Sequence, residues 1–338
     1  MRKYLLDPSK KFFKGNMHCH SNLSDGRFTP EELKERYKAM GYSFLAITDH
    51  EFFVAHPELD DEEFITITSA EYAIKQFPKQ STLKNFNMKV CHLNFYAMRQ
   101  DNDFCVRYNS VYDHYSSPEL RATLKLPETE EDRVYGAEGI NKLIADAKAS
   151  GCFVCYNHPR WSLENYGDYC GYEGLWGVEV YNHSCGVGGL YDYDINVVDD
   201  MLRDGKRVFV SCGDDNHNAR AEERMLDSFG AFVMVNTDTL SYSSIIDGLL
   251  SGNFYASMGP TIDELYVEDG KVYVKCSSAA RISYSTMGRR TKAVNAAEGE
   301  SVCEAVFEIK DTDEFFRIDV VDAKGRHANT QAYYLNEI

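Results

Sequence analysis

Short apolar strands alternate with amphipathic helices along most of this sequence, and the alternation restricts the folds that the chain can adopt. A strand followed by a helix and then by another strand is typical of a parallel sheet covered by helices. We therefore expect an α/β fold. Strands are expected at 43–48, 64–70, 89–96, 152–156, 176–182, 207–214 and 229–235, and helices at 138–149, 194–204 and 242–250.

The first expected helix has clear start and stop signals. Thr29 is a good N-cap, Pro30 suits the first helical position, and Glu32 completes a capping box with Thr29. Gly41 is a suitable end signal. A helix from about residue 30 to residue 41 is therefore predicted.

Two segments depart from the alternation. Residues 97–137 are polar and rich in tyrosine, too long for a plain loop, and are expected to pass over the rim of the active site. After residue 260 short strands follow one another, with an Asp269-Gly270 hairpin turn. We predict a barrel domain over 1–260 and a small β-sandwich over 261–338.

Histidines and carboxylates lie within or just after the expected strands. The carboxyl ends of parallel barrel strands meet at one face, where active sites lie. Singly, a strand histidine is more often a hydrogen-bonded core residue, but so many buried charges need partners, and metal ions would satisfy them together. The candidate metal ligands are His18, His20, Asp25, His50, Glu71, His92, His158, Asp215 and His217.

Two pairs among these candidates have the two-residue spacing of a strand face. His18 and His20 would point to the same side and share one ion, with Cys19 pointing away, and Asp215 and His217 repeat the spacing. Asp25 is close enough in sequence to supply a neighbouring ion. Imidazole with carboxylate suits zinc, manganese or iron and does not decide among them.

Charge and cysteine usage narrow the possible partners. The formal net charge of −17 disfavours polymeric nucleic acid. A signal peptide and a membrane-spanning stretch are not expected, so we predict a cytoplasmic protein. Cys152 and Cys155 form a C-x-x-C pattern inside an apolar strand, where they would face opposite sides, so buried thiols are favoured over a redox pair.

The motifs HCHSNLSDG, TDH, NHP and GDDNH, in this order and with the segments around Glu71 and His92, resemble those of the PHP (polymerase and histidinol phosphatase) superfamily. The resemblance covers about residues 15–260 and implies a distorted barrel of seven strands and seven helices. The tail, with GNFYASMGP and FFRIDVVDAKGRHA, resembles more loosely the β-domain of the CehA-like subgroup.

The resemblance implies a trinuclear metal site. The first ion would bind His18, His20, Glu71 and Asp215, the second would share Glu71 and add His92 and His158, and the third would bind Asp25, His50 and His217. Asp215 is assigned as the ligand because it keeps the two-residue step to His217. Asp214 would support the ligands without binding an ion.

We expect hydrolysis of a small-molecule phosphomonoester by a metal-activated hydroxide. Arg160 is the candidate phosphate contact, with a surface salt bridge as the alternative, and Arg220 is a weaker one. His183 is a candidate general acid, although a loop histidine more often only shapes a site.

Two other functions remain open: hydrolysis of a carbamate or carboxylic ester, and a non-catalytic binding protein on the same fold. Filled ligand positions disfavour the second. Tyr108, Tyr112 and Tyr115 in the rim segment would either line a substrate pocket or pack in the core. We can identify no protein partner from the sequence.

Overall fold

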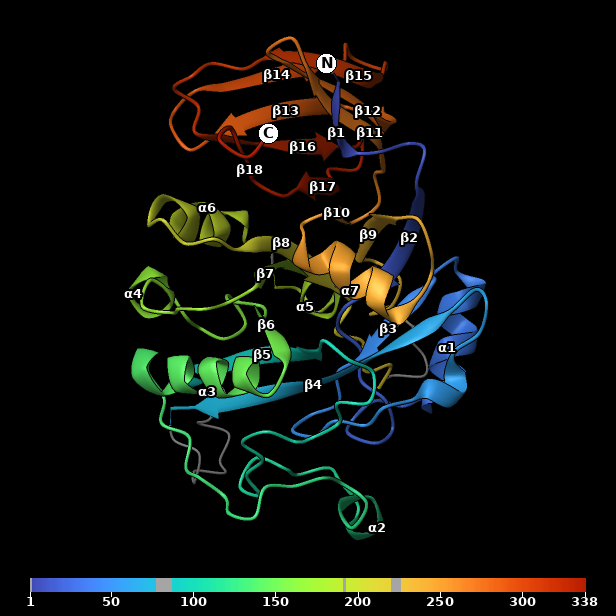
Figure 1. Cartoon of the computed structure of the whole chain (residues 1–338), viewed down its shortest axis with the longest axis vertical. Helices are drawn as coiled ribbons and strands as arrows, with labels where there is room; N and C mark the ends of the chain where they lie inside the picture. Colours follow the sequence, from blue (N-terminus) through green and yellow to red (C-terminus); the bar gives the residue numbers. More distant parts are fainter. Residues whose placement is uncertain (1, 77–86, 191–192, 220–225) are drawn as a thin grey trace.

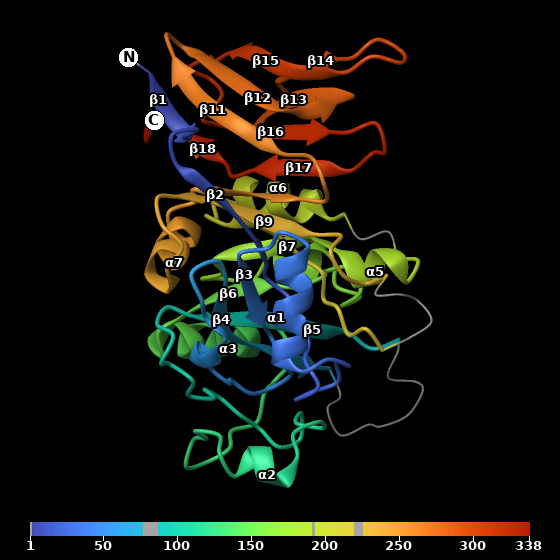
Figure 2. The same cartoon turned by 90° about the vertical axis from the view of Figure 1, so that its right-hand side faces the viewer.

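A computed structural model describes residues 2–76, 87–190, 193–219 and 226–338. It contains a large mixed sheet with helices around it and a separate four-stranded antiparallel sheet (Figure 1). The expected α/β class is confirmed at this level. Figure 2 shows the C-terminal strands at one end of the long axis and the rim segment at the other.

The central part of the large sheet runs in the order β9-β2-β3-β4-β5-β6-β7-β8 and curls back on itself. Beyond β8, Asp215 N donates to His18 O at 2.8 Å and His20 N donates to Asn216 O at 3.1 Å, so the end of β8 meets the end of β2. The strands are β2 (Lys11–Asn16), β3 (Phe44–Ile47), β4 (Ile65–Lys75), β5 (Val90–Ala97), β6 (Cys152–Tyr156), β7 (Gly177–Asn182), β8 (Phe209–Gly213) and β9 (Phe232–Thr237).

Helices cover the outside of this sheet. The predicted capping box is present: Glu32 N donates to Thr29 Oγ1 at 3.2 Å, and Thr29 N donates to the Glu32 carboxylate at 3.1 Å. The helices are α1 (Pro30–Ala39), α3 (Ala137–Ala149), α4 (Tyr166–Tyr169), α5 (His183–Val187), α6 (Ile195–Arg203) and α7 (Tyr242–Leu250), with a 3-10 turn at Pro57–Leu59.

The expectation of a wholly parallel sheet is wrong at two strands. β2, β3 and β4 are parallel, as are β6, β7 and β8, but β5 is antiparallel to both of its neighbours and β9 is antiparallel to β2. β4 and β5 pair as a hairpin, with Ala73 opposite His92. Because β5 is reversed, His92 reaches the site from near the start of its strand.

The same hairpin corrects the position of Glu71. We expected this residue at a strand end, but β4 continues to Lys75, because β5 still pairs with it beyond the last partner from β3. Glu71 is therefore held in the middle of a strand, with a backbone bridge to His50. A strand interior fixes a side chain more tightly than a loop would.

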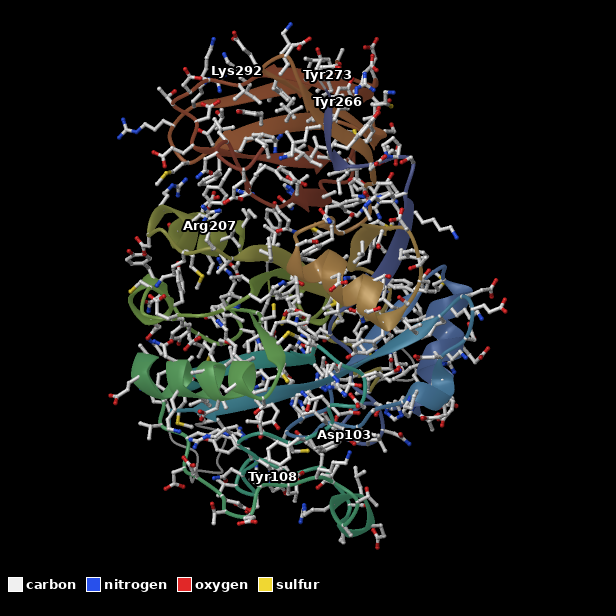
Figure 3. The ribbon with its side chains drawn as sticks, viewed as in Figure 1. Asp103, Tyr108, Arg207, Tyr266, Tyr273 and Lys292 are labelled. Carbon is white, nitrogen blue, oxygen red and sulfur yellow. The ribbon has the colours of Figure 1, made fainter. Side chains whose placement is uncertain are left out.

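The segment 97–137 lies beneath the barrel in Figure 1 and contains the short helix α2 (Pro118–Arg121). Its Tyr108, labelled in Figure 3, and Tyr112 are buried, so packing explains both. Arg133 fastens the segment to the barrel: its guanidinium lies 2.6 Å from the Glu51 carboxylate and donates to Ala73 O at 2.8 Å.

The C-terminal strands form two facing layers around a shared apolar core. One layer is the separate sheet, with β1 (Lys3–Leu6), β11 (Ile262–Glu268), β12 (Lys271–Ala279) and β15 (Val302–Glu308). The other layer continues the large sheet from β9 through β10 (Phe254–Ser257), β17 (His327–Thr330), β16 (Phe315–Val321), β13 (Arg281–Thr286) and β14 (Thr291–Asn295), with β18 (Tyr333–Tyr334) beside β16.

The predicted hairpin turn joins β11 and β12, and Asp269 and Gly270 both have positive φ, as such a two-residue turn requires. Tyr266 and Tyr273 stack across these strands at 4.7 Å (Figure 3). The domain boundary at residue 260 stays a prediction. In the structure, the N-terminal strand β1 pairs with β11 of the C-terminal strands.

All ten cysteines are free thiols. Cys152 and Cys155 are buried within β6, and burial raises the pKa of the Cys152 thiol to about 12. Within the described ranges, every helix is too short or too polar to cross a bilayer.

We expect Arg133→Ala to lower the free energy of unfolding by about 3–5 kcal/mol, because it leaves the Glu51 carboxylate buried without its cation. Chemical denaturation would measure this change. Arg99→Ala is the control, since both Arg99 and its ion-pair partner Asp101 are exposed, and its effect should stay within about 0.5 kcal/mol. Equal effects of the two substitutions would contradict the proposed anchoring role.

Candidate metal centre

The nine predicted ligands come together in three adjoining groups. In each group one potential ligand atom from every member lies within 4.8 Å of the others. The groups are His18, His20, Glu71 and Asp215; Glu71, His92 and His158; and His20, Asp25, His50 and His217.

Glu71 lies at the middle of these groups. Its Oε1 is 3.1 Å from His92 Nδ1 and 3.3 Å from His158 Nε2. Its Oε2 faces the other way, 3.2 Å from His50 Nδ1. The side chain is 1% exposed. One carboxylate therefore serves neighbouring groups with different oxygens, as a bridging ligand does.

Asp215 organises the first group. Its Oδ1 lies 3.0 Å from His20 Nε2 and 3.1 Å from His18 Nε2, and those two nitrogens are 3.3 Å apart. The two-residue spacing of His18 and His20 thus brings both rings to one side, as predicted.

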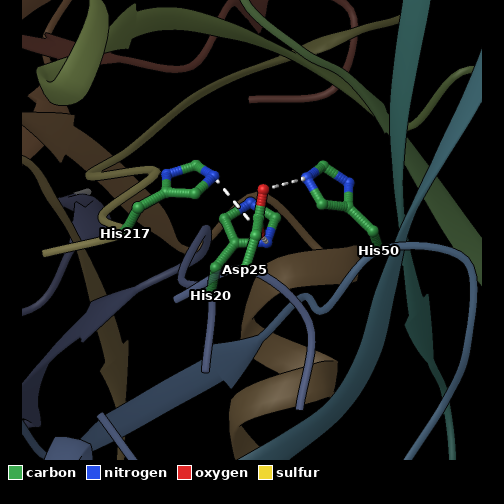
Figure 4. Close-up of side chains that lie close together, drawn as sticks. All are labelled: His20, Asp25, His50 and His217. Carbon is green, nitrogen blue, oxygen red and sulfur yellow. Dashed lines mark ion pairs between the residues drawn. The ribbon is translucent and has the colours of Figure 1, made fainter. Parts of the chain in front are cut away.

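Asp25 organises the third group (Figure 4). Its two oxygens each lie 3.4 Å from one imidazole nitrogen, Oδ2 from His50 Nε2 and Oδ1 from His217 Nε2. His20 also enters this group, because its Nδ1 lies 3.7 Å from Asp25 Oδ1. The sequence assigned His20 to the first group alone, whereas the structure places it between two.

Three observations fit these residues to metal ions. The donors are imidazole nitrogens and carboxylate oxygens, which bind zinc, manganese and iron. His20 Nδ1 is buried and, within the described part of the chain, has no hydrogen-bond partner. His158 and Asp215 have positive φ, of 25° and 52°, and such strained backbone clusters at functional sites.

The pKa shifts follow from packing histidines against carboxylates. Burial by itself would raise the pKa of Glu71, but the imidazolium charges of His92 and His18 hold it well below its usual value. Burial would lower the pKa of His158 and His217, but Glu71 and Asp25, respectively, raise both to about 9. Without metal, these two histidines are cationic at neutral pH.

Neighbouring side chains orient the ligands. Glu179 Oε1 accepts a hydrogen bond from His18 Nδ1 at 2.9 Å, and Asn182 donates to both Glu179 and Asp215. Asn157 donates to Glu71 Oε1 at 2.8 Å. The sequence analysis missed Glu179, although an acid inside the apolar strand WGVEVYN is a signal that it has a buried partner.

Close packing around His18 requires Gly213. A Cβ on Gly213 would lie 2.4 Å from His18 Cβ and 2.7 Å from Glu179 Oε1. The glycine at the end of β8 therefore allows the first and last strands of the barrel to approach.

Asp214 supports the site indirectly. Its carboxylate accepts hydrogen bonds from Tyr37 Oη at 2.7 Å and from three successive backbone amides, of residues 229–231, at 2.7–2.9 Å. Burial raises the pKa of Asp214 to about 7. This carboxylate fixes the turn before β9 and is outside the three ligand groups.

The remaining candidates lie outside the three groups. Arg160 is half-exposed, with Nη2 3.6 Å from Asp194 Oδ1. His183 begins α5, with its Nδ1 2.9 Å from Tyr181 Oη and its ring against Gly230. The predicted roles of both stay predictions. Arg220 lies outside the described residues.

No family model and no curated protein matches this chain. Among solved structures, a two-domain protein from Bacteroides vulgatus containing a "predicted PHP-like metal-dependent phosphoesterase" has 13% identity and a TM-score of 0.45. The match covers 97% of this chain and 96% of that one. Over most of its length the chain thus matches a two-domain PHP-like protein at distant identity.

Two other solved structures match a smaller part of the chain. A candidate metal-dependent phosphoesterase from Bifidobacterium adolescentis has 15% identity and a TM-score of 0.37, covering 61% of this chain and 88% of that one. An amidohydrolase from Chromobacterium violaceum, with bound sulfate and no metal, has 15% identity and a TM-score of 0.35, covering 60% and 87%.

We expect Glu179→Ala to weaken metal binding about 10–100-fold, because His18 loses the carboxylate that fixes its ring. Metal content after dialysis against graded chelator would measure the change, with circular dichroism to check folding. Glu119→Gln, in exposed α2, is the control. Unchanged affinity in a folded Glu179→Ala protein would show that His18 needs no such partner.

Metal uptake at pH 7 should release more than two protons per chain, because His158 and His217, with pKa values of about 9, must deprotonate to bind ions. His18 must deprotonate as well, since burial would lower its pKa but Asp215 and Glu179 raise it well above its usual value. Apparent affinity for metal should therefore rise as the pH increases from 7 through about 9. An indicator dye in weakly buffered solution would measure the release. If metal binds without releasing protons, and its affinity does not change with pH, these pKa values are contradicted.

Proposed function

We propose that this protein is a metal-dependent phosphoesterase that hydrolyses a small-molecule phosphomonoester at a centre of three divalent ions, either zinc, manganese or iron. The carrying observation is the position of Glu71, whose two oxygens face different groups of histidines in a buried site. A single-ion site would not need a carboxylate shared in this way.

The ions would be held by the three groups described above. When bound, they would acidify a water molecule and neutralise negative charge on the phosphate oxygens. The protein contributes the geometry: Glu179 orients His18, Asn182 holds Asp215, and Asn157 holds Glu71. Burial of these groups lowers the local dielectric and strengthens each electrostatic contact.

Charge balance favours a phosphate ester over a neutral ester. Three divalent ions would carry more positive charge than Asp25, Glu71 and Asp215 offset, and the six imidazoles bind as neutral ligands. Such a centre attracts an anion. A phosphomonoester dianion supplies the charge, whereas a carbamate or carboxylic ester does not.

Arg160 and His183 keep subsidiary roles in this proposal. Arg160 would contact the phosphate after its guanidinium leaves Asp194, and His183 would protonate the leaving group after it leaves Tyr181. The distorted seven-stranded barrel, the cytoplasmic location, and the absence of polymeric nucleic-acid and membrane partners belong to the same proposal.

The metal-loaded protein should release inorganic phosphate from members of a panel of sugar, nucleotide and alkyl phosphates. His92→Ala and Asp215→Asn should each lower bound metal and reduce turnover by at least about 100-fold, since each removes a ligand. Metal analysis and phosphate assays would measure both effects.

His56→Ala is the matched control, because His56 is a histidine outside the three groups. It should keep both metal and activity. If the protein hydrolyses only carbamates or carboxylic esters, the phosphoesterase proposal is wrong. If His92→Ala or Asp215→Asn keeps full activity, the ligand assignment is wrong.

A further inference from the structure

Two half-exposed aromatic side chains lie against the ligand histidines. Tyr115, from the rim segment, is 44% exposed, and Trp161, from the loop after His158, is 42% exposed. Single exposed aromatics are ordinary on a protein surface, but these two come from separate loops and meet the same buried site.

Ring contacts join the two aromatics across the ligands. Tyr115 stacks on His50, with centroids 5.4 Å apart and ring planes at 26°. Trp161 lies 5.0 Å from His92 and 4.9 Å from His158. Because His50 and His92 are 5.9 Å apart, a continuous row of rings crosses from Tyr115 to Trp161.

The Trp161 loop is anchored on the protein. Val90 N donates to Ser162 O at 3.2 Å. The nearby Glu164 carboxylate accepts hydrogen bonds from three tyrosine hydroxyls at 2.5–2.7 Å, those of Tyr135, Tyr156 and Tyr172. Trp161 is thus exposed on a fixed loop, which lowers the entropy lost when a ligand stacks on it.

Tyr115 is anchored as well. Just before it in the chain, Asp113 accepts from Ser116 N at 3.0 Å and from Tyr108 Oη at 2.6 Å. The rim segment that carries Tyr115 is itself fastened to Glu51 through Arg133.

Among the described residues, the side chains that pair with the nine ligands include neither lysine nor arginine. Within the described part of the chain, the hydrogen bonds and ion pairs of the nine ligand side chains go to histidine, carboxylate, asparagine, serine and backbone groups. Leu163, 47% exposed, adds apolar surface beside Trp161. A leaving group at this opening therefore meets aromatic and apolar surface.

We propose that Tyr115 and Trp161 bind the leaving group by stacking, so that the site prefers phosphomonoesters whose alcohol carries a flat aromatic ring over aliphatic alcohols of similar size and basicity. This proposal rests on the proposed phosphoesterase function and names its substrate class. Aromatic stacking at two rings corresponds to a preference of roughly tenfold.

Binding can be tested without turnover. The chain has two tryptophans, and Trp176 is 7% exposed, so quenching of fluorescence by a bound ring reports on Trp161. Zinc-loaded protein should bind 2-phenylethylphosphonate roughly tenfold more tightly than hexylphosphonate, with quenching that persists in Trp176→Phe. Equal affinities for the two phosphonates would overturn the proposal.

Turnover gives a second test with matched leaving groups. The kcat/KM for 2-phenylethyl phosphate should exceed that for hexyl phosphate roughly tenfold, since both release primary alcohols of similar basicity. Trp161→Leu and Tyr115→Leu should each bring the ratio towards one, and Trp161→Phe should keep most of it. Tyr166→Leu is the control, because Tyr166 is 49% exposed and its hydroxyl donates to Asp204 on the surface.

The outcomes separate this proposal from the one it rests on. If metal-loaded protein hydrolyses neither phosphate ester nor any other phosphomonoester, the proposed function fails. If it hydrolyses both esters equally, the phosphoesterase stands and the aromatic selectivity is refuted. Zinc content and circular dichroism of each variant establish that any loss of the kcat/KM ratio comes from the missing ring. If a folded, zinc-loaded leucine variant at Trp161 or Tyr115 keeps the full ratio, the proposal is also refuted.

Discussion

The structure depends on keeping the Glu71 carboxylate charged inside the protein. A buried carboxylate without compensating charge costs several kcal/mol, and here the compensation comes from five imidazoles on four segments of the chain. The hairpin of β4 and β5 and the strained turn at His158 bring nitrogen donors to this carboxylate. The turn at Asp215 adds a second carboxylate beside His18 and His20. Metal ions would complete the balance, because neutral imidazoles need a cation that they can share with the carboxylate.

Hydrogen bonds on both sides of Asp215 hold its strained backbone in place. Asp215 has a positive φ between two segments that are each fixed by hydrogen bonds: its own amide donates to His18 O, and the preceding Asp214 binds the turn before β9. Backbone strain of about 1–3 kcal/mol persists only where neighbouring contacts outweigh it. The turn can therefore present both Asp215 and His217 to the ligands while the barrel remains closed.

Local signals in the sequence were reliable because they act over a few residues. The capping box of Thr29 and Glu32, the strand at 152–156 and the Asp269-Gly270 turn all form as predicted. The helix predicted at 138–149 also forms, beginning one residue earlier at Ala137. The direction of β5 was not predictable from its hydrophobic pattern, because a buried apolar strand has the same pattern in a parallel sheet as in an antiparallel one. For the same reason Glu71 was placed at a strand end, although the hairpin continues β4 beyond it.

The sequence by itself determined that the rings of His18 and His20 lie on one side, because their two-residue spacing in extended backbone fixes side-chain direction locally. Asp215 and His217 have the same spacing, but Asp215 has a positive φ beyond the end of β8, so its direction depends on the turn. Only the tertiary structure decided how the donors are shared. In the folded protein His20 lies between two groups, and Glu179 is hydrogen-bonded to His18. Asp214 accepts hydrogen bonds from the turn before β9. Tyr115 and Trp161 lie against His50 and His92, respectively. These pairings join residues far apart in the chain, so they follow from strand direction, barrel closure and loop anchoring, which no short segment encodes.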